Sequence, residues 1–137
     1  MAEYTFKTWE SGNTYTIYTE FNRIEKYNEY CKKWLNDYYN LNISFTSKIN
    51  WTYKDIIDIK DFNRLKQNIN ILLEALNIES KINVTTQANQ TFNTEKANEL
   101  ENKLKEYLTK LGQWQFMYNV TRMTRCGGNN LKLAEGN

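Results

Sequence analysis

The sequence predicts a mainly α-helical domain of the α+β class: a three-helix bundle with a small β element formed by N-terminal and C-terminal strands. Apolar residues recur in three long stretches at spacings of three and four, which places them on one face of a helix. Shorter stretches near both ends alternate between apolar and polar residues, and this period of two predicts the strands. We expect a single domain over 1–137, with an N-terminal arm (1–18), a helical core (19–112) and an aromatic strand with a C-terminal tail (113–137).

The N-terminal arm is expected to form one or two short strands. Tyr4 and Phe6 share one parity in residues 3–18, and Tyr15 shares the other parity with Ile17. The sequence Glu-Ser-Gly-Asn between these pairs favours a turn.

The first helix is expected to begin at Thr19, whose hydroxyl is a fair N-cap, and to end near residues 39–40. Its apolar stripe consists of Phe21, Ile24, Tyr27 or Cys31, Trp34, Leu35 and Tyr38. A polar connection over 41–50 follows, and residues 49–57 are expected to form a short packed turn or helix anchored by Trp51.

The second helix is expected to begin at Asp58, whose carboxylate can cap it, and Asp61 three residues later favours the positive helix end. Its stripe consists of Phe62, Leu65, Ile69, Leu72, Leu73 and Leu76. Residues 79–93 are polar and β-branched, which predicts a loop or a short strand at 82–84.

The third helix is expected to begin at Asn93 or Thr94 and to end at Gly112, a residue suited to the left-handed C′ position. Its stripe consists of Ala97, Leu100, Leu104, Tyr107 or Leu108, and Leu111. Beyond it the period changes to two, because Trp114, Phe116, Tyr118 and Val120 alternate with Gln115, Met117 and Asn119. Residues 113–120 are therefore expected to form a strand with one aromatic face.

Two helices open with nearly the same phrase. "EFNRIEKYNEYCKKWL" begins at Glu20, and "DFNRLKQNINILLEAL" begins at Asp61. Asn22, Asn63 and Asn98 then occupy matching first-turn positions of the three helices. There an Asn side chain can cap the helix or bond the backbone of a loop.

Composition argues against most catalytic and membrane functions. The chain has no His, five scattered Gly and a net charge of +2 with basic and acidic residues interleaved. These features disfavour His-based catalysis, a Gly-rich phosphate loop and nucleic-acid binding. No signal peptide, membrane-spanning segment, cofactor or metal site is expected; Asp55, Asp58 and Asp61 are interpreted as helix caps rather than a cation site. Cys31 is expected to be a buried thiol, although a disulfide with Cys126 stays open.

The aromatic residues are the best candidates for a binding surface. Tyr and Trp tolerate partial exposure and are enriched at protein interfaces. The candidate interface positions are Trp9, Tyr30, Trp114, Phe116 and Tyr118. The same rings could instead cover the bundle as core, or form a stacking platform for a glycan.

Three segments together resemble a known class of proteins. They are "YTEFNRIEKYNEYCKKWL", "SKINWTYKDIIDIKDFNRLKQNINILLEAL" and "TFNTEKANELENKLKEYLTKL", the last followed by aromatic residues and a Cys-Gly turn. In this order, from Tyr15 to Gly128, the chain resembles small tail-module structural proteins of phages and prophages of low-GC Gram-positive bacteria. The chain has Ile57 where that class often has Pro, and Gly128 where it often has Glu.

The resemblance implies a non-enzymatic virion protein that acts as a connector at the baseplate, tail tip or fibre attachment. Its expected partners are other tail, baseplate or fibre proteins, with a homo-oligomer also open, and its expected location is the virion tail after assembly in the bacterial cytoplasm. Two alternatives remain: a glycan-binding or cell-surface-binding module, and a small cytoplasmic regulator of a host protein.

Overall fold

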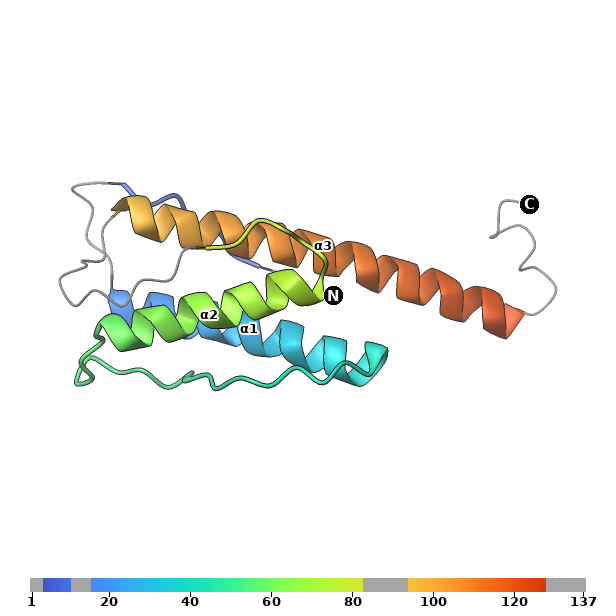
Figure 1. The fold of residues 1–137 in the computed structure, drawn as a ribbon, viewed down its shortest axis with the longest axis horizontal. Coiled ribbons are helices and arrows are strands. Elements are labelled where there is room, and N and C mark those ends of the chain that lie inside the picture. Colours follow the sequence, from blue (N-terminus) through green and yellow to red (C-terminus); the bar gives the residue numbers. More distant parts are fainter. Residues whose placement is uncertain (1–3, 11–15, 83–93, 128–137) are drawn as a thin grey trace.

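In the part of the chain that the structure describes, three α-helices form a bundle, as the sequence predicts (Figure 1). The computed structural model of the protein describes residues 4–10, 16–82 and 94–127. The helices are α1 (Ile17–Tyr39), α2 (Ile59–Ala75) and α3 (Thr94–Gly127). All three pack against one another, so each buries its apolar face against the other two.

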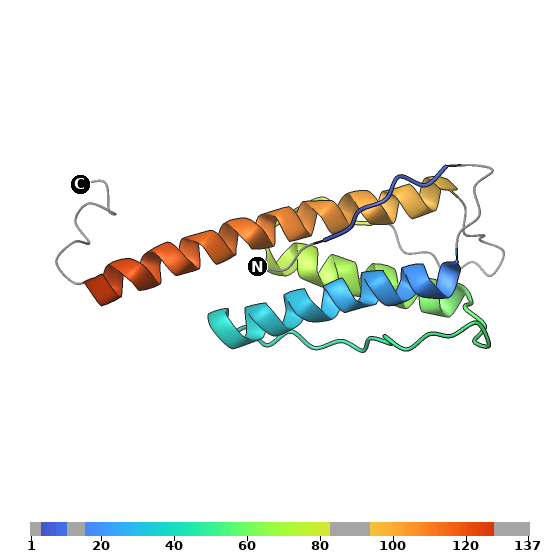
Figure 2. The same ribbon diagram turned by 180° about the vertical axis from the view of Figure 1, so that it is seen from behind.

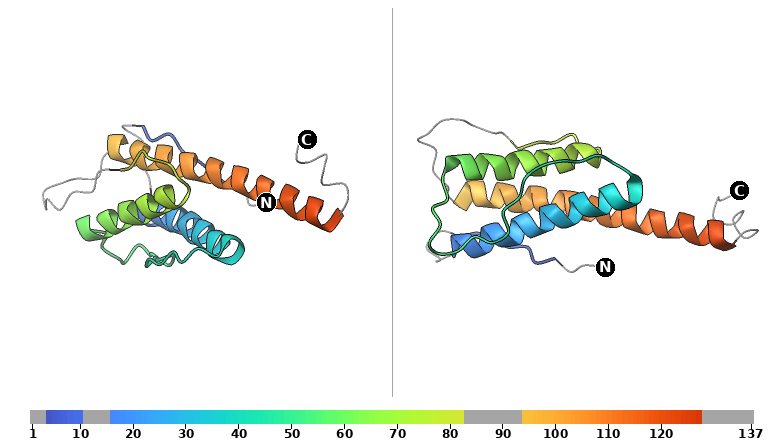
Figure 3. Two further views of the ribbon diagram at one scale, coloured as in Figure 1. Left: turned by 45° about the vertical axis from the view of Figure 1, so that its right-hand side comes forward. Right: turned by 90° about the horizontal axis from the view of Figure 1, so that it is seen from below.

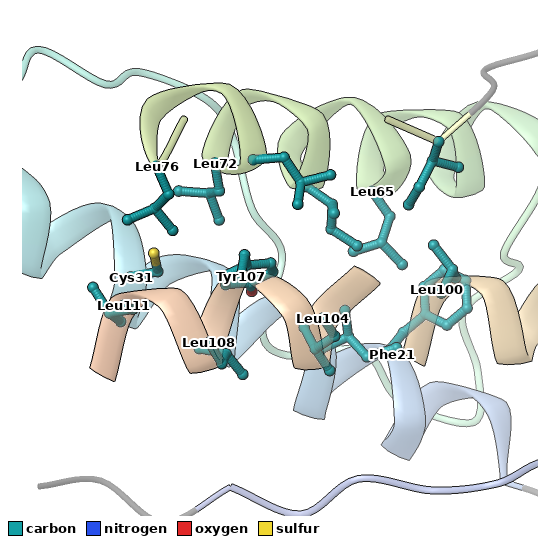
Figure 4. Close-up of a cluster of buried hydrophobic side chains, with 14 of the residues drawn as sticks. Phe21, Cys31, Leu65, Leu72, Leu76, Leu100, Leu104, Tyr107, Leu108 and Leu111 are labelled. Atoms are coloured by element: carbon teal, nitrogen blue, oxygen red, sulfur yellow. The ribbon is translucent and has the colours of Figure 1, made fainter. Parts of the chain in front are cut away.

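The core consists mainly of the apolar stripes that the sequence predicts (Figure 4), with Trp51 and Ile82 added from the connections. Its fully buried members are Cys31, Leu35, Leu65, Ile69, Leu72, Leu73, Leu76, Leu104, Tyr107 and Leu111. Each such aliphatic or aromatic side chain contributes about 1.5–3 kcal/mol relative to exposure.

Cys31 is a free thiol within the described structure, and its burial raises its pKa well above the usual range. Tyr38 is the outlier of the predicted stripes, because 47% of it is exposed.

The helix starts are close to expectation. Helix α1 begins at Ile17, two residues before the predicted cap, and follows Thr16, whose side chain makes no capping hydrogen bond. Helix α2 follows Asp58, whose carboxylate accepts from the backbone N–H groups of Lys60 at 3.0 Å and Asp61 at 3.2 Å. The Asp61 carboxylate accepts in turn from the Asp58 N–H at 3.0 Å, which completes a capping box.

The remaining aspartate of the acidic series also has a structural role. The Asp55 carboxylate accepts from the Thr52 N–H at 2.8 Å, and this hydrogen bond is the main reason why the pKa of Asp55 is lowered. No group of three or more His, Cys, Asp or Glu residues that could hold a metal ion occurs in the ranges described above.

The predicted β element is wrong. Helix α3 continues through Gly112, so residues 113–120 are helical, and no strand forms anywhere in the described ranges. Trp114 and Tyr118 are four residues apart and share one helix face, whereas Phe116 is 64% exposed. Val84, part of the other expected strand, lies outside the described residues.

Extended segments run beside the helices in place of a sheet. Within the described structure, four Asn side chains each accept from the N–H and donate to the C=O of a single extended residue, an arrangement that we call an amide bracket. The brackets join Asn22 to Trp51 (2.8 and 2.9 Å), Asn36 to Ile43 (2.9 and 3.0 Å), Asn70 to Ile82 (both 2.8 Å) and Asn98 to Trp9 (2.7 and 3.0 Å). A carboxamide offers the same donor and acceptor as a peptide group, so it can satisfy backbone that a neighbouring strand would otherwise pair.

Two of these brackets lie beside buried carboxylates. The indole N–H of Trp51 donates to Glu25 at 2.7 Å, and that of Trp9 donates to Glu101 at 3.2 Å. In both cases the glutamate follows the bracketing asparagine by three residues, so one helix face holds both ends of a tryptophan. The expectation that Asn22 and the matching Asn of α3 bond loop backbone is therefore confirmed.

The repeated Asn-Arg phrase also ties the helices together. Arg64 of α2 makes two contacts with the Glu25 carboxylate, at 2.6 and 2.8 Å. Arg23 of α1 pairs with Glu101 of α3 and, at 3.0 Å, with Glu20. These glutamates are at most 4% exposed, and the arginines supply the positive charge that buried carboxylates require.

Helix α3 runs well past the ends of α1 and α2, as both sides of the molecule show (Figures 1 and 2). It has 34 residues, against 23 in α1 and 17 in α2. The last α3 residue in the Leu core is Leu111. None of the described helices has the combination of length and apolar content needed to span a bilayer.

Candidate interaction surface

A groove lies where α3 passes the C-terminal half of α1. One face of α1 and one face of α3 line it, and its volume is about 580 Å³. The lining residues are Tyr30, Lys33, Trp34, Asp37 and Tyr38 from α1, and Gln115, Tyr118, Asn119 and Arg122 from α3. Both sets have helical spacings of three and four, so the groove is the open continuation of the seam between the two helices. We call it the α1–α3 groove (Figure 3, right, shows the two helices from below).

The apolar part of the groove is a cluster of rings. Trp34 packs on Tyr38 with ring centroids 5.1 Å apart, and Tyr118 meets both rings edge-on, at 5.8 and 5.2 Å. Behind them Tyr39 packs on Trp114 at 4.9 Å, and its hydroxyl donates to the Trp114 carbonyl at 3.3 Å. Aromatic pairs of this kind stabilise by about 0.5–1.5 kcal/mol each beyond their buried area. The cluster therefore fixes α3 against the end of α1.

The polar part of the groove contains an incompletely paired amide. Gln115 is 6% exposed, and its Nε2 donates to the Tyr30 hydroxyl at 2.9 Å. Its Oε1 has no hydrogen-bond partner among the residues that the structure describes. Reversing the amide would only exchange which of its two polar atoms is left over. An unpaired buried polar atom costs about 1–3 kcal/mol.

The rim of the groove is charged. Lys33 and Asp37, four residues apart on α1, form an exposed ion pair at 3.0 Å. Arg122 adds a positive charge on the α3 side.

Burial and the neighbouring Tyr118 raise the pKa of the Tyr39 hydroxyl, so the phenol is neutral at physiological pH.

The structure separates the predicted interface residues into three environments. Tyr30 and Tyr118 lie together in the α1–α3 groove, and Trp114 is half-buried behind it. Phe116 points away from the cluster and is exposed. Trp9 is only 5% exposed, so its side chain fastens residues 4–10 to α3 and is not offered to a partner.

The predicted interface positions include two of the nine residues that line the groove, Tyr30 and Tyr118. The seven that they leave out are Lys33, Trp34, Asp37, Tyr38, Gln115, Asn119 and Arg122. A helical pattern in the sequence could have indicated the α3 side of the groove. Spacings of three, one and three separate Gln115, Tyr118, Asn119 and Arg122, which places them on one helix face. The aromatic residues of 113–120 also fit a period of two, which predicts a strand, and the two patterns compete.

Comparisons of the chain with protein-family models, with curated proteins and with solved structures found no match. The class that the sequence motifs suggest therefore remains an expectation.

Proposed function

We propose that this chain is a non-enzymatic assembly protein of a phage tail or phage-like particle. In this role it connects other tail proteins at the baseplate, tail tip or fibre attachment. The observation that carries the proposal is the projection of α3 beyond the bundle, with exposed apolar side chains on it and the α1–α3 groove at its base.

Residues 113–122 of α3, which pack on one side against the end of α1 and lead into the projecting end of the helix, are here called the α3 arm. Phe116 and Met117 on this arm are 64% and 57% exposed. A short helix gains most of its stability from packing rather than from intrinsic propensity. A partner that covers the two side chains would stabilise both the complex and the arm, by up to about 1.5–3 kcal/mol for each side chain fully buried. Aromatic side chains in such positions frequently dominate binding.

The resemblance of the sequence to tail-module proteins supplies the class of partner. It covers Tyr15 to Gly128 and includes both Asn-Arg phrases. Their arginines, Arg23 and Arg64, form ion pairs with buried glutamates, and Asn22 of the first phrase forms a bracket. A rigid bundle with one arm suits a connector, because the bundle can be held by one neighbour while the arm engages another.

The test is mass spectrometry of tail particles purified after induction of the source strain. We expect the protein at a fixed ratio to the major tail proteins, and its absence would refute a place in the finished tail. Particles from a strain carrying Phe116→Ser should contain less of the protein. The matched control is Ile56→Ser, because Ile56 is an 87% exposed apolar residue outside the arm. Equal incorporation of the two variants would show that the arm is not the contact.

A further inference from the structure

The seam between α1 and α3 already holds one extended segment of this chain. Residues 4–10 lie along it (Figure 2), with Trp9 bracketed by Asn98 at one end. At the other end Tyr4 packs against Tyr27 and Tyr30, with ring centroids 5.2 and 6.2 Å apart. The seam therefore binds extended polypeptide.

The α1–α3 groove continues this occupied seam. Tyr30 contacts Tyr4, the first described residue of the segment, and is also a lining residue of the groove. The segment touches α1 at Glu20, Arg23, Tyr27 and Tyr30, and the groove carries the same stripe on through Trp34 and Asp37. These positions follow one another at spacings of three and four, so they form a single face of α1.

The chemistry of the occupied seam is repeated in the open part. In the occupied part an amide side chain pairs with backbone, and aromatic rings contact the side chains of the segment. The open part has an amide with an unpaired atom at Gln115 and a wall of rings at Trp34, Tyr38 and Tyr118. Both requirements for binding a further extended residue are therefore present.

We propose that the α1–α3 groove binds an extended peptide segment of a partner protein, with Gln115 pairing with its backbone and the ring wall holding one large apolar or aromatic side chain. Eight residues of helix separate Tyr30 from Tyr38, about 12 Å, which matches three or four extended residues. Lys33, Asp37 and Arg122 together leave one positive charge on the rim, so an acidic residue beside the aromatic one is favoured. The inference rests on the proposed function, because it specifies how the assembly protein engages its neighbour.

The probe is an acetylated and amidated peptide with the sequence of residues 4–10, Tyr-Thr-Phe-Lys-Thr-Trp-Glu, because this seam is known to hold that chemistry. It is titrated into the ¹⁵N-labelled full chain, and chemical-shift changes are mapped by NMR. We expect changes within 30–38 and 115–122, and at least tenfold weaker binding by Gln115→Leu and by Tyr38→Ala. Phe116→Ala, on the exposed side of the arm, should bind as the unmodified chain does. A peptide with Ser at each aromatic position should not bind.

Folding of the variants is checked separately. Gln115→Leu removes the unpaired amide from a buried position, so we expect its melting temperature to stay within a few degrees of the original. Tenfold weaker binding in a variant of unchanged stability would assign the amide a binding role that loss of folding cannot mimic.

Several outcomes would overturn the proposal. Shift changes centred on Asn98 and Glu101 would mean that the peptide only displaces the chain's own segment. Binding that appears only after residues 1–3 are deleted would make the chain's own N-terminus the occupant. Binding of diacetylchitobiose but not of the peptide would make the occupant a saccharide, and a peptide-independent dimer dispersed by Tyr38→Ala would make it a second copy.

The inference and the proposed function can fail separately. If Gln115→Leu reduces incorporation into particles but the peptide does not bind, the connector role stands and the extended-peptide mode fails. If the peptide binds but the protein is absent from tail particles, the groove is a peptide site and the tail role fails.

Discussion

The replacement Gly112→Ala tests the course of α3 directly. The sequence alone places Gly112 at a left-handed helix end, whereas the structure places it in the interior of a helix that continues to Gly127. A Cβ built on Gly112 has no described atom within 4 Å outside the helix's own turns, so alanine meets no obstacle. The two descriptions predict opposite signs for the change in stability.

Alanine is favoured over glycine inside a helix by about 1 kcal/mol. The unfolding entropy of globular proteins is about 2.1 cal/mol/K per residue, or roughly 290 cal/mol/K for a chain of this length. The expected increase in melting temperature is therefore about 3–4 °C. At a left-handed position the same replacement would lower stability by a comparable amount, because a Cβ is disfavoured there.

The assay is thermal and urea unfolding followed by far-ultraviolet circular dichroism. Gln113→Ala is the matched control, since Gln113 is the exposed helical neighbour and should change stability by only a few tenths of a kcal/mol. Asn77→Gly measures the effect of glycine at a position that is left-handed in the structure, for comparison with Gly112. Asn77 has φ 63°, so glycine should be tolerated there. A loss of 1 kcal/mol or more in Gly112→Ala would refute the continuous helix and with it the α1–α3 groove.

Three further predictions concern the buried interactions. Glu25→Ala should lower the free energy of unfolding by about 3 kcal/mol or more, because it removes the carboxylate that Arg64 contacts twice; a loss below 1 kcal/mol in urea unfolding would contradict this. Asn98→Ala should speed amide hydrogen exchange of Trp9 at least fivefold with a smaller effect on global unfolding, since its bracket holds residues 4–10 locally; unchanged exchange at Trp9 would count against the bracket. Burial raises the pKa of the Cys31 thiol, so the folded state excludes the thiolate and stability should fall as pH rises above the unfolded pKa of about 8.5, by up to about 1.4 kcal/mol per pH unit from this group. Cys31→Ala should show a shallower decline between pH 8.5 and 10 in the same assay, and parallel curves would contradict the assignment.

The bundle could be predicted because burial selects helix faces with a clear period. The stripe of α2 and its start at Asp58 show this best: the spacing of its leucines and the Asp58–Asp61 capping box are both local properties of the sequence. Such features depend on residues three or four positions apart, so one sequence is enough to find them.

The C-terminal course of α3 could not be predicted by the same rule. A period-two pattern over 113–120 predicts a strand only if every aromatic residue needs the same buried face. Phe116 breaks that condition because it is exposed, whereas Trp114 and Tyr118 have the helical spacing of four and meet Tyr39. Beyond Leu111 the buried position of α3 is a polar residue, Gln115, so the pattern of apolar residues no longer marks the buried face of the helix.

The N-terminal segment shows a second limit of the period-two pattern. Alternation around Tyr4 and Phe6 predicts a strand, and this prediction is wrong, because a segment becomes a strand only when another backbone pairs with it. Here the side chain of Asn98, from a helix distant in sequence, pairs with Trp9 in place of a strand. The position of Asn98 was singled out from the sequence, but its partner could not be, because the contact spans 89 residues.

The amide bracket of Trp9 also fixes an order of events during synthesis. The hydrogen bonds that Lys7 and Trp9 make to Asn98 and Glu101 span 89 to 94 residues. A ribosome therefore makes Trp9 well before it completes the start of α3, where the Trp9 side chain docks. Until then Trp9 lacks both of the side chains that hold it, so its docking can only follow the synthesis of that helix.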